Sequence, residues 1–191
     1  MGKFKESQTA KNLLISFAFE SQANNRYLFF ANQAKEDGYM QIARIFTETA
    51  AQEFEHGLRF FKFFSGGELE ITASFFTGVI KATYDNLLAS AALENKVHTQ
   101  LYPEFAEMAR QENYERAAET WEAIIVAERH HETLFLALAE NIRSGKIFKR
   151  DEKVVWRCVN CGYLHEGTDA PEKCPACVRP HGYFEILCEN I

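Results

Sequence analysis

Six side chains of metal-binding types recur in the first three quarters of the sequence. They are Glu20, Glu53, His56, Glu94, Glu128 and His131. In two places a histidine follows a glutamate by three residues: Glu53 with His56, and Glu128 with His131. Residues three apart lie on one face of an α-helix, so each pair would present a carboxylate and an imidazole together. This spacing indicates metal chemistry.

A bound metal would also balance the charge of the four glutamates. All four fall in apolar stripes of helical periodicity, where a carboxylate without a cation is costly to bury. Clustered carboxylates would repel one another and become protonated, whereas two divalent ions carry the opposite charge. Single glutamates from two helices and Glu-x-x-His pairs from two others form the ligand set of di-iron and di-manganese bundles. These ligands suit iron or manganese, and the residue types leave zinc open.

The positions of the six residues also predict how they share two ions. From their positions we expect Glu53 and Glu128 to bridge the ions. The other four ligands divide into one pair for each ion: Glu20 with His56, and Glu94 with His131. The four glutamates of this centre are the candidate catalytic residues.

Four long amphipathic helices must carry these residues, so the chain is predicted to be mainly α. Helical periodicity covers residues from about 8–36, 40–64, 80–113 and 114–143. Pro103 must end or kink the third helix. The first and second glutamates are separated by almost the same number of residues as the third and fourth, which predicts two similar hairpins. Residues 68–78, about 35 Å long when extended, would connect the hairpins as a long crossover.

The last quarter of the chain contains a second candidate metal site. Cys158 and Cys161 form one pair with two residues between them, and Cys174 and Cys177 form another. Two such pairs predict a tetrahedral four-sulfur site, which zinc and iron fit equally well by spacing. A redox-active carboxylate pair needs electrons one at a time, which favours iron. From Lys146 the composition becomes rich in cysteine, proline and glycine, so we predict a bundle at 1–147 and a small metal-knuckle domain at 148–191.

Composition limits the classes of partner. The chain has 191 residues, 47% of them hydrophobic, and a formal net charge of −6, with an isoelectric point near 5.6. This charge argues against nucleic-acid and anionic-membrane surfaces, so small molecules or proteins are the expected partners. There is no apolar run of signal-peptide or membrane-spanning length. We therefore expect a cytoplasmic protein.

The sequence is similar to the rubrerythrins, which combine a ferritin-like four-helix bundle with a rubredoxin-like domain. The similarity rests on Glu20, Glu53-Phe-Glu-His56, Glu94, Glu128-Arg-His-His131 and both cysteine pairs. It spans both predicted domains. It implies two iron ions in the bundle and one in the tetrathiolate site.

The resemblance also implies a function. Rubrerythrins are homodimeric cytoplasmic peroxidases that reduce hydrogen peroxide to water in defence against oxidative stress. Reducing equivalents pass from an NAD(P)H-dependent reductase or a soluble rubredoxin through the iron tetrathiolate. In that family the tail of one subunit lies near the di-iron centre of the other.

One position departs from the family pattern. The family usually has a further glutamate ligand three residues after the glutamate of the third helix, and this chain has Val97 there. Loss of that negative charge is expected to raise the reduction potential and to favour oxygen relative to peroxide. His98, four residues after Glu94, is a candidate replacement ligand. Tyr27, two turns after Glu20, is interpreted as a packed core residue in preference to a hydrogen-bond donor near the metals.

Two other functions use the same residues. A ferroxidase or iron-handling protein would use the six bundle ligands with oxygen as oxidant, although it would have little use for an electron-transfer tail. A non-enzymatic zinc protein would use the tail as an interaction module and would be colourless.

Overall fold

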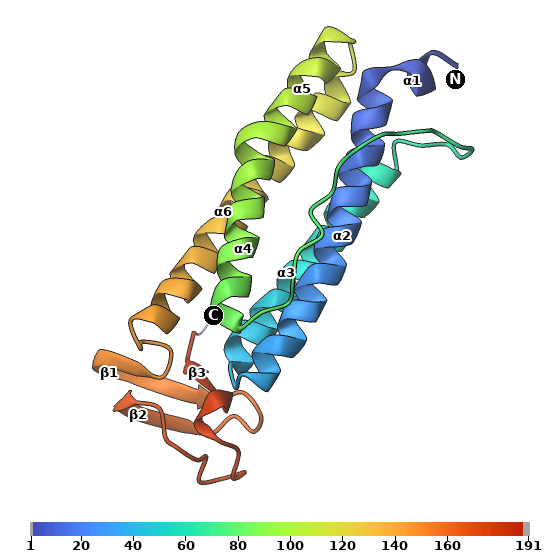
Figure 1. The fold of residues 1–191 in the computed structure, drawn as a ribbon. Helices are drawn as coiled ribbons and strands as arrows, with labels where there is room; N and C mark the ends of the chain where they lie inside the picture. Colours follow the sequence, from blue (N-terminus) through green and yellow to red (C-terminus); the bar gives the residue numbers. More distant parts are fainter. Residues whose placement is uncertain (1, 189–191) are drawn as a thin grey trace.

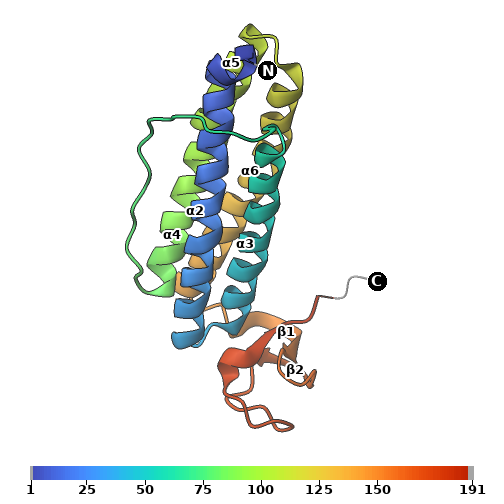
Figure 2. The ribbon, with the colours of Figure 1, turned by 90° about the vertical axis from the view of Figure 1, so that its right-hand side faces the viewer.

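A long helical bundle carries a small β domain at one end in the computed structural model, which describes residues 2–188 (Figure 1). The helices are α1 (Gly2–Glu6), α2 (Gln8–Glu36), α3 (Met40–Phe61), α4 (Thr83–Lys96), α5 (Tyr102–Gln111) and α6 (Glu115–Arg143). The strands are β1 (Lys149–Cys158), β2 (Leu164–Asp169) and β3 (Phe184–Ile186). In Figure 2, α2, α3, α6 and the rod formed by α4 and α5 lie side by side. The predicted mainly α fold is confirmed.

Each hairpin turn of the bundle caps a helix in the other hairpin. Asp37, between α2 and α3, accepts hydrogen bonds from the backbone N–H and hydroxyl of Thr83 at the start of α4. Glu112, between α5 and α6, accepts from the backbone N–H groups of Gln8 and Thr9 at the start of α2. The N–H groups of a first helical turn have no partner within their helix. These carboxylates therefore stabilise the helices and join the hairpins.

The third rod is interrupted by a π-helical turn, Val97–Leu101, between α4 and α5. The sequence predicts one helix from about residue 80 with a disturbance at Pro103. The disturbance is confirmed as the π turn directly before Pro103, which itself stands in the first turn of α5, and α4 begins at Thr83, close to the predicted start. The change in helix geometry lies in this π turn, just before the proline. It also shifts the face that later residues present to the core.

The connection between the hairpins is longer than predicted. Residues 62–82 contain no helix or strand, because α3 ends at Phe61 and not near residue 64. The connection runs back along α2 (Figure 1). The side-chain amide of Gln22 donates to the carbonyl of Phe76 at 2.9 Å, and the Arg26 guanidinium lies 5.3 Å from the centre of the Phe76 ring. The crossover is therefore held against α2.

The core of the bundle is divided into two apolar clusters. One includes Tyr27, Phe30, Phe46, Leu87 and Phe135. The other includes Leu13, Phe60, Val97, Tyr102 and Trp121. All four rods contribute to both clusters, and along each rod a predicted glutamate ligand lies between the two contributions. The clusters therefore enclose the polar level of the bundle from both ends.

The small domain is a three-stranded antiparallel sheet in the order β2-β1-β3. Its core contains Trp156, Phe184 and two of the four knuckle cysteines, Cys158 and Cys174. Phe148 packs against this core and also against a cluster of the bundle. We propose that the boundary between the bundle and the small domain lies between residues 147 and 148. Residues 189–191, which are predicted to belong to the small domain, lie outside the described part of the chain.

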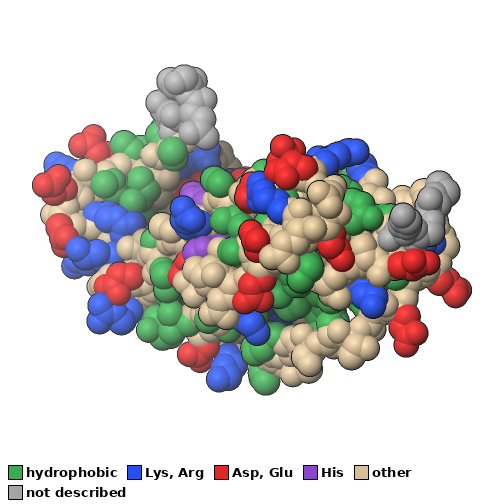
Figure 3. Space-filling model, turned by 90° about the horizontal axis from the view of Figure 1, so that it is seen from above, with side chains coloured by type: hydrophobic (Ala, Val, Ile, Leu, Met, Phe, Trp, Pro, Cys, Tyr) green, Lys and Arg blue, Asp and Glu red, His purple; other side chains and the backbone are tan. Residues whose placement is uncertain are grey.

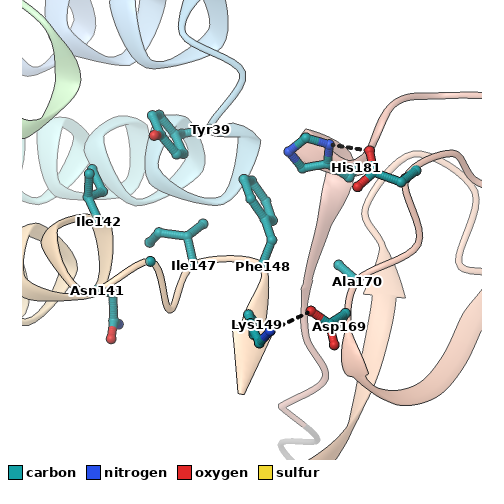
Figure 4. Close-up of a pocket in the computed structure, with 11 residues that line it drawn as sticks. Tyr39, Asn141, Ile142, Ile147, Phe148, Lys149, Asp169, Ala170 and His181 are labelled. Atoms are coloured by element: carbon teal, nitrogen blue, oxygen red, sulfur yellow. Dashed lines mark ion pairs between the residues drawn. The ribbon is translucent and has the colours of Figure 1, made fainter. Parts of the chain in front are cut away.

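The small domain packs against the turn between α2 and α3. Figure 4 shows Tyr39 of the bundle above Phe148; their rings stack with centres 6.0 Å apart, and Phe148 contacts His181 edge-on at 4.5 Å. Gly182 approaches the turn so closely that a Cβ there would lie 2.1 Å from the carbonyl oxygen of Gly38. Only glycine fits this contact.

The surface seen from above carries acidic and basic side chains in mixture (Figure 3). The expected lack of a nucleic-acid partner stays a prediction. Among residues 2–188, no helix combines the length and apolar character needed to cross a membrane.

Candidate dimetal centre and four-cysteine site

The structure brings the six predicted ligands of the bundle together in two overlapping groups. Within each group, the ligand atoms all lie within 4.8 Å of one another. One group is Glu20, Glu53, His56 and Glu128, and the other is Glu53, Glu94, Glu128 and His131. Glu53 and Glu128 belong to both groups. This is the arrangement in which two shared carboxylates can bridge two ions, although the coordination itself stays a prediction.

Both histidines direct one ring nitrogen between the shared carboxylates. His56 Nδ1 lies 2.8 Å from Glu53 Oε2 and 3.0 Å from Glu128 Oε1. His131 Nδ1 lies 2.9 Å from Glu128 Oε2 and 3.0 Å from Glu53 Oε1. The one-turn spacing of each Glu-x-x-His pair places glutamate and histidine together, and the packing of α3 near α6 brings the pairs face to face. Nδ1 is therefore the nitrogen that would bind metal.

Burial and mutual charge interactions shift the pKa values of four of the ligands, Glu20, Glu94, His56 and His131. Burial and the charges of Glu128 and Glu53 raise the pKa values of Glu20 and Glu94 well above the usual range. Burial alone would lower the pKa values of the two histidines. Hydrogen bonds from the histidines to Glu53 and Glu128, together with the negative charges of these carboxylates, outweigh burial and raise the pKa of His56 to about 11 and of His131 to about 9. Without metal, protons on these four residues balance much of the carboxylate charge.

The residues fit a pair of divalent metal ions. Glu53 Oε1 and Glu128 Oε1 are buried carboxylate oxygens that each lie 3.0 Å from one imidazole nitrogen, but neither has a hydrogen bond of good geometry within the described residues. A buried acceptor without a partner is costly unless an ion meets it. The donor set of carboxylate oxygens and two imidazole nitrogens suits iron or manganese. Two divalent ions carry the same charge as the four protons that they would replace.

Iron binding to the bundle is therefore expected to release protons. Near pH 7, about two protons should leave the imidazolium rings for each pair of ions, with up to about two more from Glu20 and Glu94. Because the raised histidine pKa values favour the proton over the metal, the apparent iron affinity should increase as the pH rises toward 9. The measurement is an anaerobic pH-stat titration of protein whose four-cysteine site is already loaded. Release of less than one proton per pair of ions would contradict this charge balance.

Two buried tyrosines support the outer glutamates. The Tyr27 hydroxyl donates to Glu94, and the Tyr102 hydroxyl donates to Glu20. Tyr27 packs in the core as interpreted, but the preference against a hydrogen-bonding role was wrong. Sequence reasoning missed Tyr102. The internal repeat contains the signal, because Tyr102 follows Glu94 by one residue more than Tyr27 follows Glu20, and the π turn supplies that residue.

Val97 and His98 both lie in the π turn, and neither adds a carboxylate. Val97 is 7% exposed and packs in the apolar cluster with Tyr102. His98 Nε2 lies 2.5 Å from Glu132 Oε2, and Glu132 also accepts from Asn95. His98 therefore does not replace the missing ligand: it faces Glu132, away from the two ligand groups, as expected for a residue on the other side of the stripe from Glu94.

Gln52 is a second residue that sequence reasoning missed. Its side-chain oxygen lies 2.9 Å from His131 Nε2. An amide oxygen only accepts, so this contact places a hydrogen on Nε2 and leaves Nδ1 as the metal-facing nitrogen. Gln52 lies one residue before Glu53, on the side of α3 next to α6. No spacing rule distinguishes it from an ordinary surface glutamine.

The four cysteines converge in the small domain as predicted. Their sulfurs lie within 4.8 Å of one another, with Cys158 and Cys177 sulfurs 3.7 Å apart and Cys161 and Cys174 sulfurs 3.6 Å apart. Sulfurs about 2.3 Å from a central ion form a tetrahedron with edges of about 3.8 Å, so the site fits one tetrahedral metal ion.

Two matching knuckle turns hold the cysteines. The N–H of Gly162 donates to the carbonyl of Cys158 at 2.8 Å, and the N–H of Val178 donates to the carbonyl of Cys174 at 2.9 Å. Both turn residues have positive φ, 78° for Gly162 and 56° for Val178. Glycine adopts this backbone readily, whereas valine does so under strain.

Both metal sites lie in sequence regions that match models of known protein families. A family model described as "Rubrerythrin" matches residues 11–139, and one described as "Rubrerythrin, rubredoxin-like domain" matches residues 156–185. The chain is 54% identical over 190 residues to the rubrerythrin of Nitratidesulfovibrio vulgaris, with 100% of both chains covered. It is 50% identical over 186 residues to the rubrerythrin of Porphyromonas gingivalis, covering 97% of this chain and 93% of that protein.

Solved structures show the same architecture. Nigerythrin in a fully reduced, all-ferrous state aligns with a TM-score of 0.63 and 31% identity, over 94% of this chain and 86% of that chain. A bacterioferritin from Desulfovibrio desulfuricans aligns with a TM-score of 0.67 and 19% identity, over 74% of this chain and 84% of that chain, and shows a likeness of fold alone. The bundle is therefore ferritin-like, and the chain belongs to the rubrerythrin family.

Proposed function

We propose that this protein is a non-haem di-iron peroxidase that reduces hydrogen peroxide to water in defence against oxidative stress. The observation that carries the proposal is the presence, in one chain, of a buried carboxylate and histidine site for two ions and a separate four-cysteine site. When bound, the iron pair supplies the two electrons of each reduction. One peroxide, two protons and two electrons give two waters.

Iron is the proposed metal at both sites. The related nigerythrin structure is described as all ferrous, which supports iron in this chain. Four thiolates suit iron that carries one electron at a time, and carboxylates with imidazoles suit iron that reacts with oxidants. Zinc or manganese would fit the same residues without the proposed electron supply.

The chain's own residues set the conditions for this chemistry. The shared carboxylates Glu53 and Glu128 would bind both ions, and apolar clusters pack on both sides of this level of the bundle. The Tyr27 and Tyr102 hydroxyls hold Glu94 and Glu20 in place. No side-chain nucleophile is needed.

We propose a homodimer in which the tail of one subunit supplies the bundle of the other. Within one chain, the small domain contacts the bundle at Gly38, Tyr39 and Arg44. At a rise of about 1.5 Å per residue, Arg44 is about 13 Å or more along α3 from Glu53. A partner's tail placed beside the middle of the bundle would shorten that path. The proposed donors are an NAD(P)H-dependent reductase or a rubredoxin in the cytoplasm.

Catalytic assay of purified protein tests the proposal. The protein, with iron in both sites, is incubated anaerobically with hydrogen peroxide and a chemical reductant, and loss of peroxide is measured. Continuous turnover is expected. An absence of turnover with both sites filled would remove the peroxidase assignment.

The rival functions give different results in the same preparation. A ferroxidase would take up iron beyond the bound ions when supplied with oxygen. A non-enzymatic zinc protein would lack the colour that thiolate-to-iron charge transfer gives. Metal analysis together with a visible spectrum of fresh protein separates all three functions.

Val97→Glu is expected to lower the reduction potential of the bundle irons. A fifth carboxylate stabilises two ferric ions more than two ferrous ions, by about 2 kcal/mol or about 90 mV for one electron. The ratio of peroxide to oxygen activity should rise. Potentiometric titration followed by absorbance measures the shift, and Val97→Gln, which adds similar volume without charge, is the control. An unchanged potential in Val97→Glu would mean that Val97 only packs.

A further inference from the structure

The small domain meets the end of the bundle at a joint that encloses a cavity of about 250 Å³. Figure 4 shows Ile142 and Ile147 of the bundle on one side of Phe148, and Asp169 and Ala170 of the small domain on the other. All five residues line the cavity. Surfaces that enclose a cavity of this size do not pack closely there. The position of the small domain therefore depends on the contacts beside the cavity.

One group of these contacts is uncharged and lies at the turn between α2 and α3. Tyr39 stacks on Phe148, and Gly182 lies against the carbonyl oxygen of Gly38. Phe148 directly precedes β1, so the stack fixes where the chain enters the small domain. Because both contacts are made at a single turn, they leave rotation of the domain about that turn open.

The other contact is a carboxylate held between two guanidinium groups. Nη1 of Arg44 on α3 lies 2.7 Å from both carboxylate oxygens of Glu185, and Arg157 on β1 contacts the same carboxylate. Glu185 lies on β3 and is 8% exposed. Hydrogen bonds between charged groups are about twice as strong as those between neutral groups. This docking contact, Arg44–Glu185–Arg157, therefore ties α3 to two strands of the sheet.

The docking contact lies next to the four-cysteine site in the sheet. In the antiparallel register of β1 and β3, Arg157 is opposite Glu185, and Cys158 is opposite Phe184. Cys158 is fully buried and supplies one sulfur to the four-sulfur group. A contact that holds Glu185 on α3 therefore also holds a metal ligand on the neighbouring residue pair of the same two strands.

We propose that Glu185 is a positioning residue for electron transfer and that Arg44 holds it in place. The inference rests on the proposed electron relay, in which one electron leaves the four-cysteine iron and one ferric iron of the bundle becomes ferrous. No bond breaks and no proton moves in this step, so at fixed reduction potentials its rate depends on the distance and orientation of the two sites. In the proposed homodimer, the docking contact also fixes the domain relative to the partner's bundle, because the two bundles pack together.

Arg44→Met removes the charge on the bundle side of the docking contact and keeps most of the side-chain length. The Arg44 side chain is 57% exposed, so the fold and the iron content should not change. The fully reduced protein is mixed anaerobically with about one hydrogen peroxide per chain, which the bundle irons consume. Absorbance then follows oxidation of the four-cysteine iron. Its rate constant should fall by about tenfold or more, because a small displacement of a reacting group has a large effect on rate. The first oxidation of the bundle irons should stay within about twofold of the unaltered protein.

Cleavage by trypsin measures the docking itself, without any reaction of the irons. Lys146 lies in the segment between α6 and β1, where its half-exposed side chain is paired with Asp151. A protease acts on such a segment mainly in its open state. A domain that leaves the bundle more often exposes this segment more often, so cleavage after Lys146 should become about tenfold faster in Arg44→Met.

Three further variants test whether the contact acts as a unit. Arg44→Lys keeps the positive charge and should hold both the transfer rate and the cleavage rate within about threefold of the unaltered protein. Arg59→Met changes the other arginine of α3, about 22 Å further along the helix, and should leave both rates within about twofold. Glu185→Gln should slow transfer as Arg44→Met does. The double variant should lie within about twofold of either single variant, because both changes remove the same contact.

An unchanged transfer rate in Arg44→Met would overturn the positioning role. Slower transfer without faster cleavage would also overturn it, because the domain would still be docked and the charge alone would be responsible. Failure of the proposed relay gives a different pattern: the four-cysteine iron of the unaltered protein would stay reduced after peroxide, while cleavage would still be faster in Arg44→Met than in Arg44→Lys. The two failures are therefore distinguishable.

Discussion

Glu53→Ala and Glu128→Ala are each expected to leave less than about one iron ion in a bundle that otherwise binds about two. Each of these carboxylates belongs to both ligand groups and lies about one hydrogen-bond length from both histidines. A bridging ligand serves both ions, so its removal weakens both positions at once. Elemental analysis of protein purified in excess ferrous iron measures the ratio of iron to chain.

Glu55→Ala is the matched control for these variants. Glu55 is an exposed glutamate two residues after Glu53, so its removal should leave both irons bound. Circular dichroism should show the same helix content in all of these proteins. Two irons retained in both the Glu53 and Glu128 variants would refute the bridging assignment.

Cys158→Ser and Cys174→Ser are each expected to abolish reductant-driven turnover, with a loss of about a hundredfold or more. Both cysteines are fully buried in the core of the small domain and supply sulfurs to the four-sulfur group. The electron supply would be lost while the bundle ligands remain. Peroxide should therefore still oxidise a chemically prereduced bundle once, at nearly the normal rate.

Cys188→Ser removes a thiol outside the four-sulfur group and should not reduce turnover. The bundle iron content of all three cysteine variants should match that of the unaltered protein. If either knuckle variant also lost the bundle irons, the separation of chemistry in the bundle from supply in the tail would be wrong.

The six bundle ligands could be predicted because helical periodicity is a local property. Glu53 and Glu128 each precede a histidine by one turn, and burial of such a pair on an apolar stripe has few explanations besides metal. The near-equal hairpin spacings then predicted that all six residues meet at one level. The two cysteine pairs are equally local, because each pair needs only one knuckle turn.

Tyr102 and Gln52 could not be predicted by the same reasoning. Tyr102 reaches Glu20 because the π turn shifts the face of α5. The internal repeat marks this tyrosine one residue later than its counterpart, and that offset indicates a different helix face unless the π turn is known. Gln52 acts on His131 of another helix, so its role depends on the lateral position of α3 and α6. Pro103 indicated a disturbance in this region but not where the chain would absorb it.

The position of the small domain was also beyond sequence reasoning. Arg44 of α3 contacts both carboxylate oxygens of Glu185 at 2.7 Å, and Arg157 of β1 contacts the same carboxylate. Gly182 fits against the carbonyl oxygen of Gly38 because Gly182 has no side chain. These contacts join residues far apart in sequence, and no periodicity or motif relates them.

The most direct test of the account is an anaerobic titration of the fully reduced protein with hydrogen peroxide. Absorbance follows oxidation of the four-cysteine iron, and a separate assay counts the peroxide consumed. We expect consumption of about 1.5 peroxides per chain, since three ferrous irons hold three electrons and each peroxide takes two. The four-cysteine iron should become oxidised in the same titration. Consumption that stops near one peroxide with that iron still reduced would contradict the electron relay, and no consumption would contradict the peroxidase itself.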